Sequence, residues 1–526
     1  MNCPYTVKKG TRLFMPQFFI TTAIDYVNSI PHIGTAYEKI GADILARFHR
    51  MLGDEVYFQM GNDEHSVNVK KAAEAQGLAP KAYCDQMRPK FEDVWEKLGI
   101  YCDEFIQTSD PKHHQSVSKL FKTIYDNGFI YEGDYEGLYC ESCEAFYTEK
   151  DLVDNVCPQH KTRPKFIREK NYFFKLSAFD KKLLEHIEKN PQFILPENRR
   201  NEIINVIKGG LKDVSVSRAG FDWGIPLPIK PNHVVYVWFD ALINYITWIG
   251  FADDPQKFKK WWPATLHVIG KDITRFHCVI WPAMLMAANL SLPKTVFGHG
   301  FVYLKGEKMS KSLGNVVTPL DVAEKYGPDS LRYYLLRSTS FGDDGNFTWD
   351  DFILRYNSDL ANGLGNLASR TAGMIARYFS GNMEQAKLAG EDLNLVNRYT
   401  QVLDQVKNNL DPWKSGDILF HRALEAIWAW VGEIDRYIDA EAPWTLAKQK
   451  NETRLREVLT TVTQCLYYFS CLLKPFIPQT AEKLRVMFGW NDIPFDQLNF
   501  ESKLPADPII LPQERPSLFP RIEVPK

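Results

Sequence analysis

"FFITTAIDYVNSIPHIGTAYEKIGADILARFHRMLGDEVYFQM", residues 18–60, is the stretch that decides the fold class of this 526-residue chain. The apolar run at 18–24 predicts a strand, and apolar residues at helical spacing between 40 and 52 predict a helix. A second apolar run at 55–60, bounded by glycines, predicts the next strand. Such a unit requires a parallel sheet with a right-handed crossover, so we expect an α/β fold of the Rossmann type.

Two polar motifs stand after the predicted strands: PHIG at 31–34 and GNDEH at 61–65. Ligands of parallel sheets bind at the carboxyl ends of the strands, so we expect both motifs to line one crevice. By itself PHIG is typical of an ordinary turn and helix cap. At a nucleotide, however, Gly34 would let phosphate approach the backbone, and His32 would donate to phosphate oxygens.

The composition is that of a globular protein and excludes a disordered chain. Hydrophobic residues make up 45% and charged residues 24%, and no apolar run is long enough to span a bilayer. The N-terminus has neither a secretory signal nor the character of a transit peptide, so we expect a cytoplasmic protein. The net charge of −2 means that any polyanionic partner must be held by local basic patches.

The length predicts two to four domains, and changes of pattern along the chain suggest where they lie. We expect the first half of the Rossmann catalytic domain at 1–127, a connective insertion at 128–231, and the second half at 232–304. A lysine-rich loop region follows at 305–355, then an α-helical bundle at 356–500 and a proline-rich, extended tail at 501–526.

The loop KMSKS, Lys308 to Ser312, changes the interpretation of PHIG. A charged loop is usually only solvated surface, but these two lysines could reach a triphosphate and offset charge that moves onto pyrophosphate. An HIGx motif followed by KMSKS on a parallel α/β framework resembles the class I aminoacyl-tRNA synthetases.

Further motifs narrow the resemblance to methionyl-tRNA synthetase: TTAIDYVNSIPHIG, GNDEHS, VYVWFDALINY, IGKDITRFHCVIWPAML, KMSKSLGN, GNLASR and APW. They occur in order, from about Phe18 to the final LFPRIE. The resemblance implies a ligase that forms methionyl-adenylate from methionine and ATP with Mg²⁺, and then transfers methionine to the 3′ end of tRNA(Met). It also implies that the 305–355 region contacts the tRNA stem and that the bundle binds the anticodon.

The resemblance assigns a methionine pocket to Ile24, Tyr26, Trp238, Ala241, Leu242, Tyr245, Ile273, His277 and Trp281. Rings and a shaped apolar wall suit a thioether, whose sulfur interacts well with aromatic groups. Ile273, His277 and Trp281 are spaced i, i+4, i+8, which predicts one helical face. For Ile273 alone we would accept an ordinary core face as the interpretation, whereas His277 beside Trp281 favours a binding site.

The resemblance also assigns the polar groups. Asp63 matches the carboxylate that holds the substrate's α-ammonium group. ATP contacts are implied for His32, Gly34, Gly270, Asp272, Lys308 and Lys311, with Gly270 and Asp272 at the ribose and Lys311 the more critical lysine. The implied catalytic set is His32, Thr35, Lys308, Lys311 and Asp63. No side chain need act as a nucleophile, because the methionine carboxylate itself attacks the α-phosphate.

Thr35 departs from the family pattern, since many relatives have a second histidine there. Threonine retains a hydroxyl donor for a phosphate oxygen but cannot carry a charge. Every other motif is intact, so we interpret Thr35 as a variant that leaves the chain active.

The cysteines indicate a metal. Nine cysteines are present, and CESC (Cys140, Cys143) and CPQH (Cys157, His160) form two C-x₂-C/H pairs separated by thirteen residues. That spacing is typical of a closed, tetrahedral zinc site, whereas four unrelated buried residues are the alternative. The family carries a zinc knuckle in its connective domain, so we expect one structural Zn²⁺.

In the bundle, the resemblance assigns anticodon recognition to Asn366, Arg370 and Trp444. Asn366 and Arg370 are one helical turn apart, and aromatic stacking with edge hydrogen bonds is how splayed bases are recognised. Without the resemblance, Trp444 after Pro443 would be interpreted as an aromatic packed at a helix start.

Three other functions were weighed. A synthetase for another apolar amino acid is disfavoured by the set of Trp238, Tyr245, His277 and Trp281 and by the lack of a large editing insertion. A smaller nucleotidyltransferase would lack the bundle and the zinc insert. A silent tRNA-binding scaffold would not need Asp63, Lys308 and Lys311. Relatives that dimerise often use an added C-terminal domain, so we expect a monomer.

Overall fold

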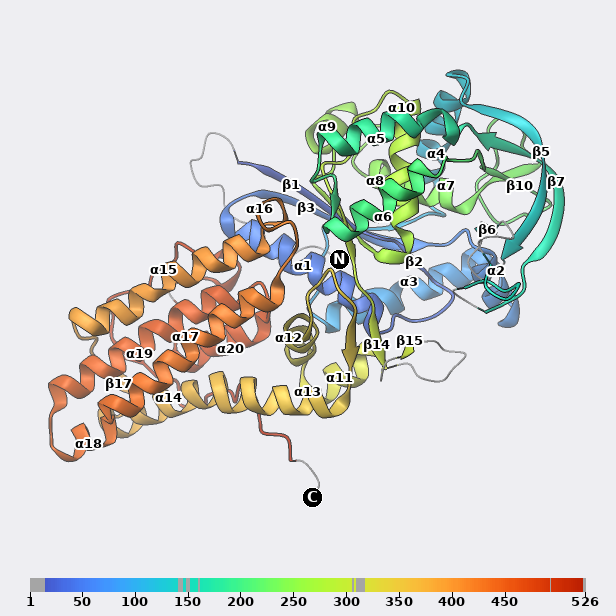
Figure 1. The fold of residues 1–526 in the computed structure, drawn as a ribbon. Helices are drawn as coiled ribbons and strands as arrows, with labels where there is room; N and C mark the ends of the chain where they lie inside the picture. Colours follow the sequence, from blue (N-terminus) through green and yellow to red (C-terminus); the bar gives the residue numbers. More distant parts are fainter. Residues whose placement is uncertain are drawn as a thin grey trace.

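The computed structural model describes residues 15–140, 145–147, 152–158, 161–304, 307–308, 317–491 and 493–523. Figure 1 shows an α/β domain with an elongated helical bundle beside it. A curved arm formed by β5 (Ile130–Cys140) and β7 (Lys165–Phe174) lies on the side of the α/β domain away from the bundle (Figure 1).

The centre of the α/β domain is a seven-stranded parallel sheet. Its main order is β4–β3–β1–β12–β13–β8, and β2 also pairs with the end of β3. Every pairing in this sheet is parallel, which confirms the expected Rossmann-type fold. The strands are β1 (Gln17–Thr22), β2 (Asp25–Tyr26), β3 (Glu55–Asp63), β4 (Glu104–Gln107), β8 (Ile194–Leu195), β12 (Leu266–Gly270) and β13 (Val296–His299).

Both faces of this sheet are buried. Along β1, Phe18 and Ile20 belong to one apolar core and Phe19 to another, because successive side chains point to opposite faces. The first core includes the apolar stripe of α1 (Ile33–Leu52) and continues into the bundle. The other helices of this domain are α2 (Val67–Ala75), α3 (Pro80–Lys97), α4 (Pro111–Asp126), α5 (Asp180–Lys189), α6 (Glu197–Lys208), α7 (Val237–Leu242), α8 (Asn244–Thr247), α9 (Pro255–Trp261) and α10 (Trp281–Ala287).

The insertion forms its own antiparallel sheet in the order β6–β5–β7–β9. Its additional strands are β6 (Ala145–Tyr147) and β9 (Val214–Ser215), and β10 (Ser217–Ala219) pairs with β11 (His233–Val235). The span 128–231 is not one continuous insertion, however. Its β8 pairs in parallel with β13 and so belongs to the Rossmann sheet. A two-residue strand has too few side chains to show an alternating pattern in the sequence.

A small sheet and a helical region follow. The sheet has the order β15–β14–β16, with β14 (Val302–Leu304), β15 (Glu307–Lys308) and β16 (Gly345–Phe347). The helices are α11 (Pro319–Tyr326), α12 (Pro328–Ser338), α13 (Trp349–Arg355), the π-helix η6 (Tyr356–Gly365), α14 (Asn366–Phe379), α15 (Gly390–Leu410), α16 (Pro412–Ser415), α17 (Phe420–Glu441), α18 (Pro443–Lys448), α19 (Glu452–Leu473) and α20 (Pro478–Phe488). In the tail, β18 (Ile509–Ile510) pairs with β17 (Asn382–Met383), and the other described residues of 501–523 form no helix or strand.

Arg332 of α12 joins the α/β domain to the bundle. It is 1% exposed, and its Nη2 lies 2.7 Å from Oδ2 of Asp43 in α1. Its Nε donates to the carbonyl of Phe476, between α19 and α20, at 2.7 Å. Asp43 also accepts from Arg47 Nε at 2.7 Å, so the buried carboxylate has two cationic partners. Because leaving a buried charge unpaired is costly, this contact holds the bundle against α1.

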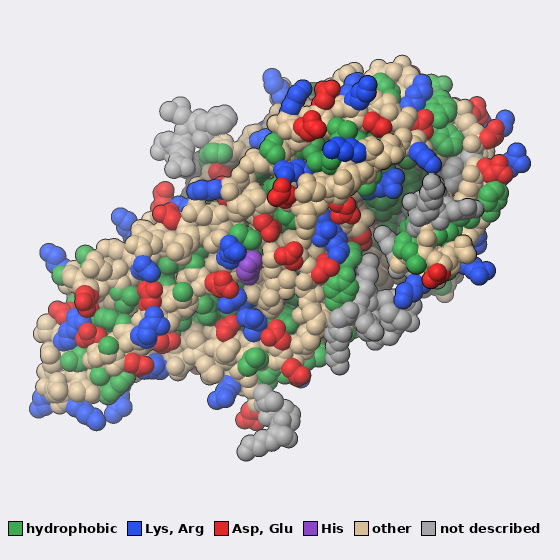
Figure 2. Space-filling model, in the orientation of Figure 1, with side chains coloured by type: hydrophobic (Ala, Val, Ile, Leu, Met, Phe, Trp, Pro, Cys, Tyr) green, Lys and Arg blue, Asp and Glu red, His purple; other side chains and the backbone are tan. Residues whose placement is uncertain are grey.

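The surface carries charges of both signs. On the face shown in Figure 2, Lys and Arg side chains are interspersed with Asp and Glu, in keeping with the net charge of −2. Among the helices within the described ranges, none has the length and apolar character needed to cross a membrane.

Candidate active site

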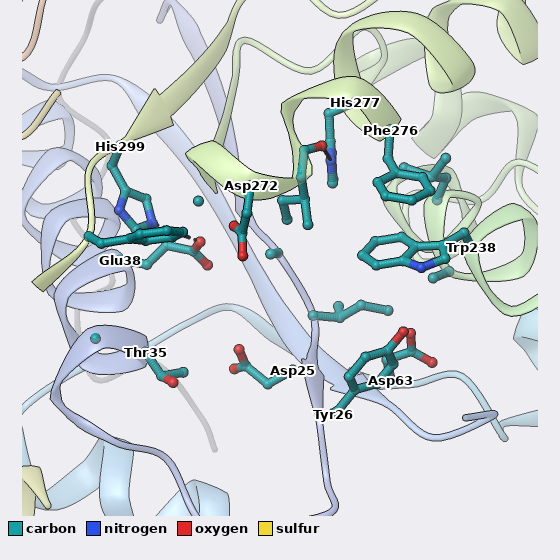
Figure 3. Close-up of a pocket in the computed structure, with 18 of the residues that line it drawn as sticks. Asp25, Tyr26, Thr35, Glu38, Asp63, Trp238, Asp272, Phe276, His277 and His299 are labelled. Atoms are coloured by element: carbon teal, nitrogen blue, oxygen red, sulfur yellow. Dashed lines mark hydrogen bonds and ion pairs between the residues drawn. The ribbon is translucent and has the colours of Figure 1, made fainter. Parts of the chain in front are cut away.

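A cavity of about 470 Å³ opens at the carboxyl end of the parallel sheet (Figure 3). Its walls come from the segments after β1, β3, β12 and β13, and from α7. Strand order reverses between β1 and β12, so this is the point at which open α/β sheets bind ligands. The expected residues that line it are Ile24, Tyr26, His32, Gly34, Thr35, Asp63, Trp238, Ala241, Leu242, Tyr245, Gly270, Asp272, Ile273 and His277.

At one end of the cavity lies the start of α1. His32 is the N-cap of this helix, and its Nδ1 accepts a hydrogen bond from the backbone N–H of Thr35 at 3.2 Å. With Nδ1 accepting, the neutral ring carries its proton on Nε2, where it can donate to a ligand. The helix N-terminus adds a partial positive charge, which favours an anion here.

Two glycines leave room for these polar side chains. A Cβ at Gly34 would lie 2.9 Å from Cε1 of His32, and a Cβ at Gly270 would lie 2.8 Å from Oδ1 of Asp272. Both contacts are closer than a real Cβ tolerates. In this structure each glycine therefore leaves space for a nearby side chain, His32 beside Gly34 and Asp272 beside Gly270.

The same end of the cavity contains a charged cluster that the sequence analysis missed. Lys39 is 1% exposed, and its Nζ lies 2.6 Å from Glu38 Oε1 and 3.1 Å from Asp25. Glu38 Oε2 lies 3.0 Å from His299 Nε2, and Figure 3 shows Glu38, His299 and Asp25 around the cavity near Thr35. Burial raises the pKa of Asp25 to about 6, although Lys39 opposes that rise.

Two of these missed residues had a usable signal in the sequence. His299 is the last residue of β13, so the rule that identified PHIG and GNDEH, a polar residue at the carboxyl end of a parallel strand, also applies to it. Glu38 lies one helical turn after Thr35 and could have been found from the same helix face. The pairing of Glu38 with His299 joins residues from distant parts of the chain, and no local pattern indicates it.

The other end of the cavity is apolar and aromatic. Trp238 stacks on Phe276 with ring centroids 3.9 Å apart, and Tyr26 meets Trp238 edge to face at 6.3 Å. His277 Nδ1 lies 3.0 Å from the carbonyl of Ile273 and therefore donates to it, so Nε2 accepts from the Tyr245 hydroxyl at 2.7 Å. Burial lowers the pKa of His277 to about 4, which keeps the ring neutral at pH 7. Such a wall suits an uncharged, polarisable side chain.

Trp281 does not line the cavity, contrary to the expectation of one helical face. The segment is a 3₁₀ turn at Lys271–Ile273, a π-helix at Phe276–Ile280 and only then α10. The N–H of Trp281 bonds to the carbonyl of Phe276, five residues back, so the i, i+4, i+8 spacing no longer defines one face. Trp281 is buried behind Tyr245, at 6.1 Å between rings, and Phe276 faces the cavity instead.

Asp63 ends β3 at the aromatic side of the cavity and is 3% exposed. Lys308 belongs to β15, where its backbone pairs with Tyr303, but its side chain and the whole of Lys311 lie outside the described residues. At this cavity the structure therefore brings together the expected ribose residues and the expected methionine residues other than Trp281, whereas the side chains of the two lysines lie outside the described residues.

Of the expected zinc ligands, Cys140 and Cys157 are described and buried, whereas Cys143 and His160 lie outside the described residues. Within the described ranges no group of three His, Cys, Asp or Glu side chains could hold a metal ion. Cys140 Sγ lies 3.5 Å from Thr162 Oγ1, and Cys157 Sγ lies 3.5 Å from the Tyr147 hydroxyl. Tyr147, which the sequence analysis did not select, also lines the cavity and so connects the segment of Cys157 to it.

The three residues expected at the anticodon are close together in the bundle. Arg370 lies over the Trp444 ring, with its Cζ 5.9 Å from the centroid, and its Nη2 is 3.4 Å from Asp439 Oδ1. Asn366 is exposed one turn before Arg370 on α14. Trp444 is 39% exposed, so it is not a packed core aromatic.

Two protein-family models and several known proteins match this chain. A family model of "tRNA synthetases class I (M)" matches residues 18–164 and 147–372, and a model of the "Anticodon binding domain of methionyl tRNA ligase" matches residues 384–509. The chain is 44% identical over 519 residues to the methionine–tRNA ligase of Caldanaerobacter subterraneus subsp. tengcongensis, covering 97% of this chain and 79% of that protein. It is 43% identical to that of Brucella suis biovar 1, covering 96% of this chain and 98% of the relative.

A solved structure agrees. Mycobacterium tuberculosis methionyl-tRNA synthetase in complex with methionyl-adenylate superposes with a TM-score of 0.90 at 40% identity, covering 96% of this chain and all of that chain.

Proposed function

The chain belongs to the methionyl-tRNA synthetase family, and on this premise we propose how its residues carry out the work of a methionine–tRNA ligase. The reaction has two steps: methionine and ATP form methionyl-adenylate and pyrophosphate, and methionine then passes to the 3′ end of tRNA(Met). The observation that carries our assignment is the shape of the cavity. One end offers an aromatic wall with the Asp63 carboxylate beside it, and the other offers a helix N-terminus.

In the first step, Asp63 holds the methionine ammonium group, and the side chain enters the wall formed by Trp238, Phe276 and the Tyr245–His277 pair. The methionine carboxylate then faces the α-phosphate of ATP. One of its oxygens attacks phosphorus and the bond to the pyrophosphate oxygen breaks, so no enzyme nucleophile is required. Catalysis consists of positioning and of stabilising the charge that develops on the phosphates.

The phosphates lie at the helix end of the cavity. His32 Nε2 and the Thr35 hydroxyl donate to phosphate oxygens, and Lys308 and Lys311 neutralise the pyrophosphate as it leaves. Asp272 accepts from the ribose hydroxyls, next to Gly270. Magnesium enters with ATP as part of the substrate.

We also propose one structural zinc ion held by Cys140, Cys143, Cys157 and His160. Support comes from the two described cysteines, which are buried without a disulfide and each have a hydroxyl at 3.5 Å. With a metal bound to the thiolates, each of these hydroxyls would be placed to donate to its sulfur. A zinc ion with four protein ligands would supply no reaction chemistry and would instead hold the short hairpin together.

For the second step, we assign Asn366, Arg370 and Trp444 to the anticodon. Arg370 and Trp444 offer a cationic group and an aromatic face on one exposed patch, which suits unpaired bases. The seven described cysteines are all free, which supports a reducing, cytoplasmic location. A monomer remains our expectation, which sedimentation of the purified chain tests.

Pyrophosphate exchange tests the assignment directly. Each of the twenty amino acids is offered with ATP and labelled pyrophosphate, and exchange should require methionine. Exchange that depends on another apolar amino acid would favour a sister synthetase. A complete lack of exchange, with tRNA binding retained, would favour a silent tRNA-binding protein.

A further inference from the structure

A buried polar cluster lies directly behind the amino-acid end of the cavity and has no role in the steps above. Its centre is Asp240 of α7, whose two carboxylate oxygens face two different histidines. His65 Nδ1 lies 2.7 Å from Oδ2, and His113 Nε2 lies 2.7 Å from Oδ1. Asp240 and His113 are fully buried and His65 is 3% exposed.

The hydrogen bonds of this cluster have defined directions. Thr247 Oγ1 donates to the carbonyl of Ile243 at 3.1 Å, so it presents a lone pair to His113 Nδ1, which lies 2.9 Å away. Both ring nitrogens of His113 are therefore donors. Burial favours a raised pKa for Asp240, but His65 and His113 hold it at about 2, so the shared acceptor is an ionised carboxylate.

The cluster joins the two walls that the substrate must fit between. His65 follows Asp63 by two residues at the end of β3, on the side of the ammonium group. Asp240 lies on α7 between Trp238 and Ala241, on the side of the methionine side chain. The hydrogen bond between His65 and Asp240 therefore spans from one wall to the other.

Further contacts hold the segment that follows β3 in place. The ring of His65 meets Trp223 edge to face at 5.2 Å, and Trp223 Nε1 donates to the carbonyl of Glu64. The Glu64 carboxylate in turn accepts from Gln107 at 2.7 Å and from the Ser109 hydroxyl. These contacts fix the end of β3 to β4 and to the insertion, and the His65–Asp240 hydrogen bond ties it to α7.

We propose that His65, Asp240 and His113 are positioning residues for methionine, which set the distance between Asp63 and the α7 wall. The proposal rests on the methionine site described above. Its rival is a purely structural role, in which a buried ionic cluster contributes stability and nothing more. The two differ in one respect: a positioning cluster affects methionine binding far more than ATP binding, whereas general loosening affects both.

Two substitutions of His65 separate these roles. His65→Leu removes the donor, and His65→Asn keeps an N–H close to the position of Nδ1. In methionine-dependent pyrophosphate exchange, we expect His65→Leu to raise KM for methionine about tenfold, with KM for ATP within about twofold of the original chain. His65→Asn should return KM for methionine to within about threefold. Melting temperature is measured on each variant.

The control is a second His–Asp pair of the same geometry, far from the cavity. His49 Nδ1 lies 2.7 Å from Asp54 Oδ2 at the C-terminal end of α1. His49→Leu should lower the melting temperature and leave both KM values unchanged. If His65→Leu does not fold, Asp240→Asn replaces it. This substitution keeps the shape of the side chain but replaces one acceptor oxygen with an amide nitrogen, which cannot accept a hydrogen bond.

Equal increases of both KM values would overturn the positioning role, as would a folded His65→Asn variant that restores nothing. Exchange by the unsubstituted chain with an amino acid other than methionine would instead contradict the proposed function, so the two failures are distinguishable.

Discussion

The cavity that we propose as the catalytic site and the bundle patch of Asn366, Arg370 and Trp444 that we propose for the anticodon present their side chains in opposite ways. At the cavity and directly behind its walls, charged groups such as Lys39, Asp63 and Asp240 are at most 3% exposed and depend on neighbours for hydrogen bonds and charge. In the bundle, Asn366 and Trp444 are exposed above an apolar core that they do not help to fill. Buried charges are stable only when paired, whereas exposed side chains need no partner.

This difference predicts how function and stability are connected in each region. A substitution in the cavity changes a hydrogen-bond network as well as a ligand contact. A substitution on the bundle patch removes a ligand contact and leaves the packed core as it was. The predictions below test that contrast, beginning with the largest expected effect.

Lys311→Ala tests the chemical contribution of the cavity. Loss of a group that stabilises the transition state should lower the rate of adenylate formation by about 10²–10³-fold, with a smaller effect on methionine affinity. Pyrophosphate exchange at saturating methionine measures it, and Lys308→Ala should have a smaller effect. Equal losses in rate and methionine affinity would mean that Lys311 shapes the site instead of the reaction.

Cys143→Ser tests whether the insertion is a local unit. Metal analysis of freshly purified protein should find one zinc per chain, and this variant should lose most of it while the bundle stays folded. Cys84→Ser is the matched control, because Cys84 is buried away from the knuckle and should retain the zinc. Two zinc ions per chain, or none, would contradict the proposed site.

Trp444→Ala should separate recognition from stability. If Trp444 stacks on a base, its loss costs about 1–3 kcal/mol, or roughly 5- to 150-fold in aminoacylation efficiency, with pyrophosphate exchange nearly unchanged. Trp430, in the same bundle but 1% exposed, is the control. Trp430→Ala should cost about 3–5 kcal/mol of unfolding free energy. A parallel fall of charging and exchange in Trp444→Ala would refute the anticodon assignment.

Thr35→His should have the smallest effect. It restores the residue that many relatives have at the start of α1, and position 35 lines the cavity with room for a donor. We expect exchange within a few-fold of the original rate, since a hydroxyl and an imidazole both donate to phosphate. An inactive but folded variant would show that the His32 cap, which uses the backbone of Thr35, requires the smaller side chain.

How far the sequence predicted the site differs between particular residues. The motifs of His32 and Asp63 were predicted to line one crevice because each stands at the end of a strand, and such ends meet in a parallel sheet. Gly270 and Trp281 were assigned from the resemblance, and Trp281 does not line the cavity, since the helical spacing expected for its segment is not regular. The segment Phe276–Ile280 is a π-helix, in which each backbone N–H bonds to the carbonyl five residues back. No periodic pattern in the sequence predicts that hydrogen bonding.

The sequence by itself determined the fold class, the family and the chemical types of side chain at the site. These follow from local periodicity and from motifs that keep their order along the chain. Only the tertiary structure decided which of those side chains form hydrogen bonds and ion pairs with one another. His65 and Asp240 are 175 positions apart, and Glu38 and His299 are 261 apart. Pairs so distant meet only when the sheet and its helices have packed, because hydrogen bonds act over a few ångströms of space and sequence separation does not enter into them.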